Sequence, residues 1–61
     1  MNEVRQVLIE AVSSKGRSRI GKIPVPALIE QEHTHRMFVV FPHLNQCRWI
    51  FKHNDPDFKV L

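Results

Sequence analysis

Apolar residues near the N-terminus recur at the spacing of one helical face, i, i+3, i+4, i+7 and i+8. They are Val4, Val7, Leu8, Ala11 and Val12. Lys15 and Gly16 follow, as at a helix C-terminus. The pattern predicts a helix over residues 3–12. A strand over the same residues stays open because VRQVLIEAV is rich in β-branched residues, although three consecutive apolar residues, Val7 to Ile9, break its alternation.

Residues 17–29, RSRIGKIPVPALI, combine strand-like isoleucine and valine with two prolines. Pro24 and Pro26 each lack an N–H group for a sheet ladder, so they confine a strand to an edge. Pro26 also suits the first turn of a helix. The segment predicts an irregular edge strand near residues 18–25 and then one short helical turn.

Two apolar, aromatic runs, MFVVF and CRWIF, predict a β-hairpin over residues 36–53. With Leu44 and Asn45 at its tip, Val40 pairs with Trp49 and Phe38 with Phe51. We expect this face to point inward, because it carries the largest rings. The opposite face is then an apolar stripe, flanked by Arg48 and Lys52, and it consists of Met37, Val39, Phe41 and Ile50. It is exposed as an interface unless the segment with Ile20, Ile23 and Leu28 folds over it, an alternative that stays open. A one-residue slip would exchange the two faces.

These elements predict an α+β fold in which an N-terminal helix packs on a small antiparallel three-stranded sheet. If residues 3–12 are a strand, the alternative is an all-β small barrel. The 61 residues suffice for one domain, 1–61. Residues 54–61 are expected to fray or to pack back on the domain.

Positive charge is clustered, although the net charge is only +3. Residues 11–29 contain no acidic residue and carry Lys15, Arg17, Arg19 and Lys22, and the predicted hairpin adds Arg48 and Lys52. Clustered cations favour nucleic acid or an acidic protein surface as partner, although lysines and arginines that merely face solvent are the commoner explanation on a small domain. We therefore predict a nucleic-acid contact through these six residues, without distinguishing DNA from RNA.

Neither a metal site nor an enzyme active site is expected. Candidate zinc ligands lack the close paired spacing of zinc sites, and they are His33, His35, His43, Cys47 and His53. The sequence also has no glycine-rich phosphate loop and no nucleophile beside a base and an orienting carboxylate. We expect no cofactor and no catalysis.

A single cysteine, Cys47, forms no internal disulfide and suits a reducing compartment. No apolar stretch approaches the roughly 20 residues of a membrane span, and the first residues do not resemble a signal peptide. A cytoplasmic protein without membrane contact is therefore expected.

The function predicted from these features is a small, non-catalytic regulatory or accessory protein that binds nucleic acid as a homodimer. Compact accessory proteins of phages and plasmids have this character. The alternative is a protein-binding inhibitor or adaptor that uses the edge strand or the stripe of Met37, Val39, Phe41 and Ile50. Nucleic-acid binding should weaken with salt, whereas an apolar protein interface should not.

Overall fold

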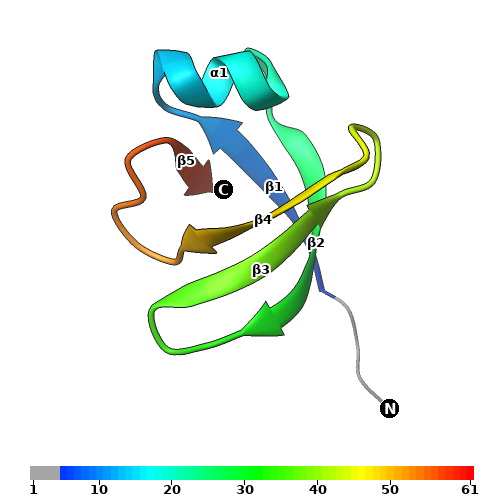
Figure 1. The fold of residues 1–61 in the computed structure, drawn as a ribbon, viewed down its shortest axis with the longest axis vertical. Helices are drawn as coiled ribbons and strands as arrows, with labels where there is room; N and C mark the ends of the chain where they lie inside the picture. Colours follow the sequence, from blue (N-terminus) through cyan, green and yellow to red (C-terminus); the bar gives the residue numbers. More distant parts are fainter. Residues whose placement is uncertain (1–4) are drawn as a thin grey trace.

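The computed structural model describes residues 5–61, in which five antiparallel strands form one curled sheet, a half-barrel, with a single short helix (Figure 1). The strands are β1 (Arg5–Ala11), β2 (Val25–Glu32), β3 (Arg36–Phe41), β4 (Gln46–Phe51) and β5 (Phe58–Val60). Their order across the sheet is β4-β3-β2-β1-β5, so the last strand returns beside the first. The helix α1 (Ser14–Ile20) lies at one end of the sheet, between β1 and β2 in the chain.

The predicted α+β fold with three strands and an N-terminal helix is wrong. Residues 5–11 form β1, which pairs with both β2 and β5; residues 3 and 4 of the predicted helix lie outside the described residues. Ile9 is fully buried in this strand, while Leu8 beside it is exposed. The consecutive apolar residues therefore reflect a strand with apolar side chains on both faces. The all-β alternative depended on a strand over residues 3–12, and the structure has the strand β1 over residues 5–11.

The C-terminal segment is part of the sheet. β5 pairs with the end of β1, with Phe58 opposite Ala11 and Val60 opposite Ile9. Phe58 is buried in the core, and the Leu61 N–H donates a 2.9 Å hydrogen bond to the Leu8 carbonyl. Residues 58–60 thus pair with β1 as part of the sheet.

The predicted edge strand over residues 18–25 is also wrong, because residues 14–20 are helical. Ser13 caps α1: its Oγ accepts a hydrogen bond from the Gly16 N–H at 2.9 Å and donates one to the Asp57 carboxylate at 2.7 Å. Ile20 is buried at the other end of the helix. Gly21, with φ of 93°, then ends α1 in a conformation that favours glycine. A cap and tertiary contacts therefore hold a helix of only seven residues.

Pro26 lies inside β2, not at the start of a short helix as predicted. Its Cα partner is Leu8 in β1, whereas the register with β3 begins only at Leu28. At Pro26 the strand therefore has a neighbour on one side only. That position accommodates a residue without an N–H group, in keeping with the confinement of proline to sheet edges.

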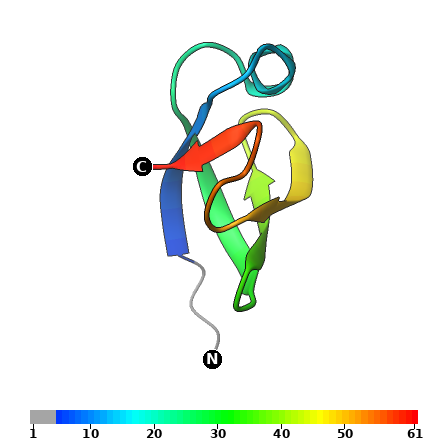
Figure 2. The same ribbon diagram turned by 90° about the vertical axis from the view of Figure 1, so that its left-hand side faces the viewer.

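The core lies inside the curl of the sheet, beneath α1 (Figure 2). Its buried apolar residues come from every described element and are Ile9, Ile20, Val25, Ala27, Ile29, Met37, Val39, Phe41, Ile50 and Phe58. Side chains of one strand alternate between the two faces of a sheet. The residues between these core positions therefore lie on the outer face, which nothing in residues 5–61 covers with a second layer.

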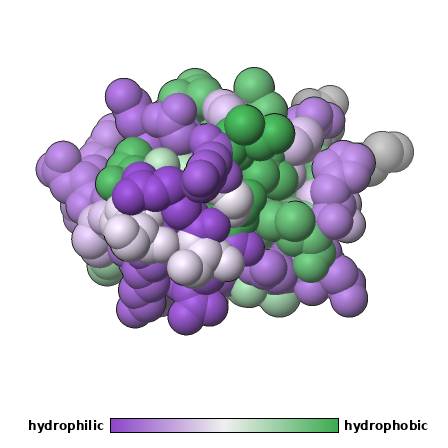
Figure 3. All heavy atoms as spheres, turned by 90° about the horizontal axis from the view of Figure 1, so that it is seen from above, coloured by the Kyte–Doolittle hydropathy of each residue, from purple (hydrophilic) through white to green (hydrophobic). Residues whose placement is uncertain are grey.

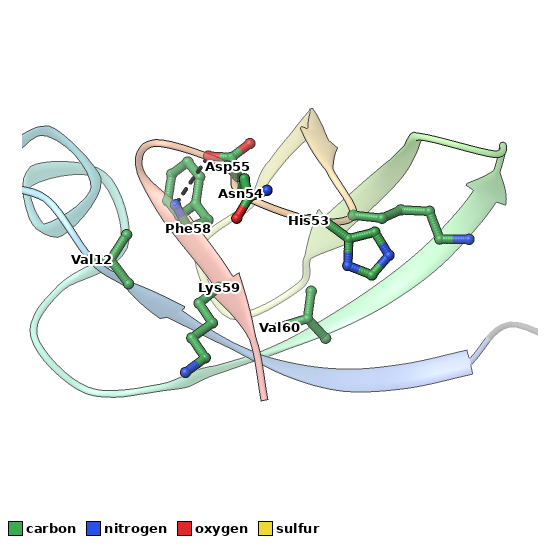
Figure 4. A pocket seen from close by; sticks show the side chains of 8 residues that line it. Val12, His53, Asn54, Asp55, Phe58, Lys59 and Val60 are labelled. Carbon is green, nitrogen blue, oxygen red and sulfur yellow. Dashed lines mark hydrogen bonds between the residues drawn. The ribbon is translucent and has the colours of Figure 1, made fainter.

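A network of hydrogen bonds to Asp55 anchors the connection between β4 and β5. One carboxylate oxygen accepts from the Phe51 N–H at 2.9 Å, and the other accepts from the N–H groups of Asp57 and Phe58 at 2.9 and 3.1 Å. Figure 4 shows the bond to Phe58. One side chain thus ties the end of β4 to the start of β5.

Glu32, at the end of β2, bridges two cations. Its carboxylate lies 2.7 Å from Lys52 Nζ and 3.1 Å from Arg5 Nη2. The hydrogen bond from Lys52, assisted by the charges of Arg5 and Lys52, holds the pKa of Glu32 below its ordinary value. Because the folded-state pKa is lowered, the stability from this site is present above the ordinary carboxyl pKa and is lost as pH falls through the lowered pKa.

Replacing Lys52 with methionine should therefore raise the pKa of Glu32 toward its ordinary value, because the largest cause of the shift is removed. An NMR pH titration of the Glu32 carboxyl carbon measures this change. The control is Lys59→Met, which removes an exposed lysine of β5 that makes no ion pair with a described carboxylate. Equal titration curves for the two variants would contradict the assignment.

Candidate binding face of the sheet

The hairpin lies where it was predicted, but its inner and outer faces are exchanged. Met37, Val39, Phe41 and Ile50, predicted as an exposed protein interface, are at most 3% exposed and belong to the core. The face predicted to point inward is outside: Trp49 is 41% exposed and Phe51 is 56% exposed. The assignment of the Met37 stripe as a protein interface is therefore wrong.

The strand register differs from the predicted one by two residues. Phe38 pairs with Trp49, Val40 with Cys47 and Phe41 with Gln46, so residues 42–45 form the turn. Asn45 in this turn has a positive φ of 53°. Because side chains alternate with a period of two, a shift of two residues leaves each set of side chains together. The exchange of faces thus arose from the choice of core, not from the register.

Aromatic and cationic side chains meet on the outer face of β3 and β4. We call this group the aromatic cluster, and it consists of His33, Arg36, Phe38, Trp49 and Phe51. Trp49 is at its centre: the Phe38 ring packs edge-on at 5.3 Å between centroids, and the His33 ring lies at 5.5 Å. The Arg36 guanidinium carbon lies 4.8 Å from the Trp49 centroid, and Phe51 is the cross-strand partner of Arg36.

Arg36 supplies positive charge to the cluster, and carboxylates border it at Glu32, next to His33 in the chain, and at Asp55, which accepts a hydrogen bond from the Phe51 N–H. No acidic residue occurs between His33 and His53, a segment that contains Arg36 and all of β3 and β4. An arginine over an aromatic ring in solvent is itself stabilised by a cation–π contact of about 0.5–1 kcal/mol. The cluster therefore presents flat rings and positive charge on the same open surface.

Apolar side chains continue the outer face across β2 and β1. Leu28 pairs with Val40, and Pro26 pairs with Leu8, which is 45% exposed. The end of the molecule at which α1 lies also carries hydrophobic residues between hydrophilic ones (Figure 3). Exposed apolar area of this kind usually marks a contact surface.

A hollow of about 220 Å³ adjoins the aromatic cluster. It is lined by residues of β2, β3, β4 and the intervening turn, namely Glu30, Phe38, Val40, Phe41, Pro42, Asn45, Gln46 and Cys47. Gln46 Nε2 donates a 3.1 Å hydrogen bond to the Arg19 carbonyl. Because Gln46 is paired with buried Phe41, its side chain reaches α1 from the core side of β4, whereas Phe38, Val40 and Cys47 line the hollow from the outer face.

The structure brings together four of the six cations predicted to bind nucleic acid. Lys15, Arg17 and Arg19 lie on α1 and Lys22 follows it; all are exposed, and none pairs with a described carboxylate. We call these four the α1 cations. They lie at the end of the sheet where β4 begins, whereas the aromatic cluster is centred toward the other end of β4.

Arg48 and Lys52 do not join that group. Arg48 lies on the core side of β4, with its guanidinium carbon 4.7 Å from the centroid of the Phe58 ring. Lys52 is bound to Glu32. Both cations therefore have structural partners. Arg36 and His33 are the polar members of the aromatic cluster. Arg36 belongs to no site predicted from the sequence, His33 was weighed there only as a zinc ligand, and the acid-free run that begins at His33 was the available signal.

A second groove, of about 360 Å³, lies between β5 and the β4–β5 connection (Figure 4). His53, Asn54 and Asp55 border it on one side, and Lys59 and Val60 of β5 on the other. The Asp55 carboxylate in this groove accepts hydrogen bonds from three backbone N–H groups, and Lys52 at the edge of the groove is bound to Glu32. The polar lining groups of the groove that are not bonded to another described residue are therefore His53, Asn54 and Lys59.

Within residues 5–61, no three His, Cys, Asp or Glu side chains gather as a metal site would require. Cys47 is exposed, with a free thiol. In the same part of the chain, no helix has the length and apolar character needed to cross a bilayer. Comparisons with protein-family models, with curated proteins and with solved structures find no match. The geometry of the outer face is therefore the basis for assigning a function.

Proposed function

We propose that this chain binds nucleic acid without catalysing a reaction, as a small regulatory or accessory protein of the cytoplasm. The observation that carries the proposal is the aromatic cluster, in which exposed Trp49 and Phe51 lie on an open sheet face beside Arg36. Aromatic rings stack on bases and cations hold phosphates. The face therefore has groups for both parts of a nucleotide, and the exposed Cys47 suits a reducing compartment.

The α1 cations support the same proposal from the other end of β4. Their side chains are exposed, and the backbone of α1 is fixed to the sheet through Ser13, Asp57 and Gln46. Cations on a fixed element that lack carboxylate partners are suited to phosphate contacts, which position a nucleic acid without reading its sequence.

Binding to a short labelled oligonucleotide should weaken steeply as salt rises, because phosphate contacts release counterions. Replacing both Arg17 and Arg19 with alanine should reduce the slope of log affinity against log salt by about 1–2, as expected for two lost phosphate contacts. Fluorescence anisotropy at several salt concentrations measures the slope. Lys59→Ala, which removes an exposed cation of β5, is the control and should leave the slope nearly unchanged. Absence of binding at low salt would refute the proposal.

A second candidate is protein binding, self-association included. The observation that favours it is the apolar part of the outer face, where Leu8 is exposed beside Pro26 and Leu28. A second copy that covers this surface would also add stability to a short chain. A dimer that resists high salt in sedimentation and is dispersed by Leu8→Glu would support this candidate instead.

A further inference from the structure

We infer that the nucleic acid bound on the outer face is single-stranded, with unpaired bases stacked on Trp49 and Phe51; this inference rests on the proposed function. In a duplex the faces of the bases are covered by their neighbours, and only base edges are reachable in the grooves. Exposed flat rings can use their faces only on bases that are out of the stack. The exposed rings of the aromatic cluster therefore select a single strand.

The spacing of the rings fits successive bases. Trp49 and Phe51 are two residues apart on one face of β4, which places their Cα atoms roughly 7 Å apart. Arg36 lies opposite Phe51 on the neighbouring strand, and its guanidinium lies over part of the Trp49 ring. One base can thus stack on Phe51, and another on the part of the Trp49 ring that Arg36 leaves free.

A path for the backbone of the strand leads away from the rings along β4. From Phe51 to Gln46 the strand is roughly 17 Å long. The hollow beside Phe38 and Cys47 lies along that path on the outer face, whereas Gln46 contacts α1 from the core side of β4. To reach the phosphate-binding α1 cations, a bound nucleic-acid strand must therefore pass the start of β4 and turn toward the core side.

Charge confines this path to one side of the face. Glu30 lines the hollow from β2, and Glu10 lies opposite Lys59 in β1, whereas β3, β4 and their turn contain no acidic residue. Glu30 repels phosphates from the β2 side, and Asp55, whose carboxylate accepts a hydrogen bond from the Phe51 N–H, repels them from the Phe51 end of β4. Arg36 and the α1 cations favour an anionic nucleic-acid strand over an apolar protein surface as the occupant of the cluster.

The test compares a labelled oligothymidylate of about ten nucleotides, within the site sizes of single-strand binders, with a labelled duplex of the same length. Anisotropy is measured at low salt for the unaltered chain, Trp49→Ala, Phe51→Ala and a control, Ile23→Ala. Ile23 is an apolar side chain that is 73% exposed and lies outside the sheet, between α1 and β2. Circular dichroism confirms that each variant is folded.

The single strand should bind at least about 10-fold more tightly than the duplex, and each ring substitution should weaken its binding about 10- to 100-fold, from the loss of one stacked base. Ile23→Ala should bind like the unaltered chain. If the duplex binds equally well and only Arg17 and Arg19 matter, the single-strand inference is wrong and nucleic-acid binding stands. If neither binds, both are wrong. Ring variants that disperse a dimer but keep oligonucleotide affinity would show that the face joins two copies of the chain.

Discussion

Replacing Phe41 with serine is expected to unfold the domain, whereas the same replacement of Phe51 leaves it folded. Both phenylalanines lie on the hairpin, but Phe41 is fully buried and Phe51 is 56% exposed. Truncating a buried phenylalanine to alanine costs about 3–5 kcal/mol, and an unpaired hydroxyl in its place costs roughly 1–3 kcal/mol more. A domain of 61 residues has a free energy of unfolding of only about 3–9 kcal/mol. The Phe41 substitution therefore removes most or all of the stability.

Urea denaturation followed by circular dichroism measures this difference between Phe41→Ser and Phe51→Ser. The pair is matched in chemistry and differs in the face on which the ring lies. Equal stability of the two variants would contradict the burial of Phe41 and would restore Met37, Val39, Phe41 and Ile50 as an exposed stripe.

Replacing Gly16 with alanine is expected to destabilise the chain by about 2–3 kcal/mol, in the upper part of the range for overpacking. By helix propensity alone, the change should stabilise α1 by about 1 kcal/mol. However, a Cβ atom at Gly16 would lie 2.4 Å from the Asp57 carbonyl oxygen and 3.2 Å from Ala11 Cβ. The same carbonyl accepts a 2.8 Å hydrogen bond from the Val12 N–H, so the clash opposes a bond that joins β1 to the β4–β5 connection.

Thermal unfolding of Gly16→Ala and Lys15→Ala separates these two effects. Lys15 is exposed on the same helix and has no such contact, so its replacement by alanine should change stability little. A Gly16→Ala variant more stable than the unaltered chain would show that α1 is not pressed against Asp57.

The position of the hairpin could be predicted from the sequence, but the direction of its faces could not. Both faces are rich in apolar residues, so the alternation of MFVVF and CRWIF defines two faces but does not show which one is buried in the core. The larger rings of Phe38, Trp49 and Phe51 suggested the core. The core instead formed from smaller side chains because Val39 lies opposite Ile29 in β2. β2 was not predicted, because Pro24 and Pro26 argued against an inner strand in this part of the chain.

For a related reason, a helix was predicted where β1 lies and a strand was predicted over part of α1. The apolar residues of β1 match a helical period because both of its faces carry apolar side chains. SKGRSRI has no apolar periodicity and only one buried apolar residue, Ile20. It is helical because Ser13 caps it and Asp57, more than 40 residues away in the chain, holds the cap. Contacts at that separation are not visible in local patterns.

The candidate site was predictable in part. The α1 cations were identified from charge clustering, and the structure places them together and exposed. Arg48 and Lys52 were included because they lie on the hairpin, but a cation on the core side of a strand finds a structural partner there. Arg36 and the rings of Trp49 and Phe51 became candidates only when the outer face was known.

The central claim, that the aromatic cluster is where single-stranded nucleic acid binds, is tested most directly by the fluorescence of Trp49, the only tryptophan in the chain. Titration with oligothymidylate at low salt should quench this emission in step with the anisotropy of the labelled strand, and added salt should reverse both. An oligonucleotide that binds by anisotropy while the Trp49 emission stays constant would contradict the claim, because the bases would then lie elsewhere.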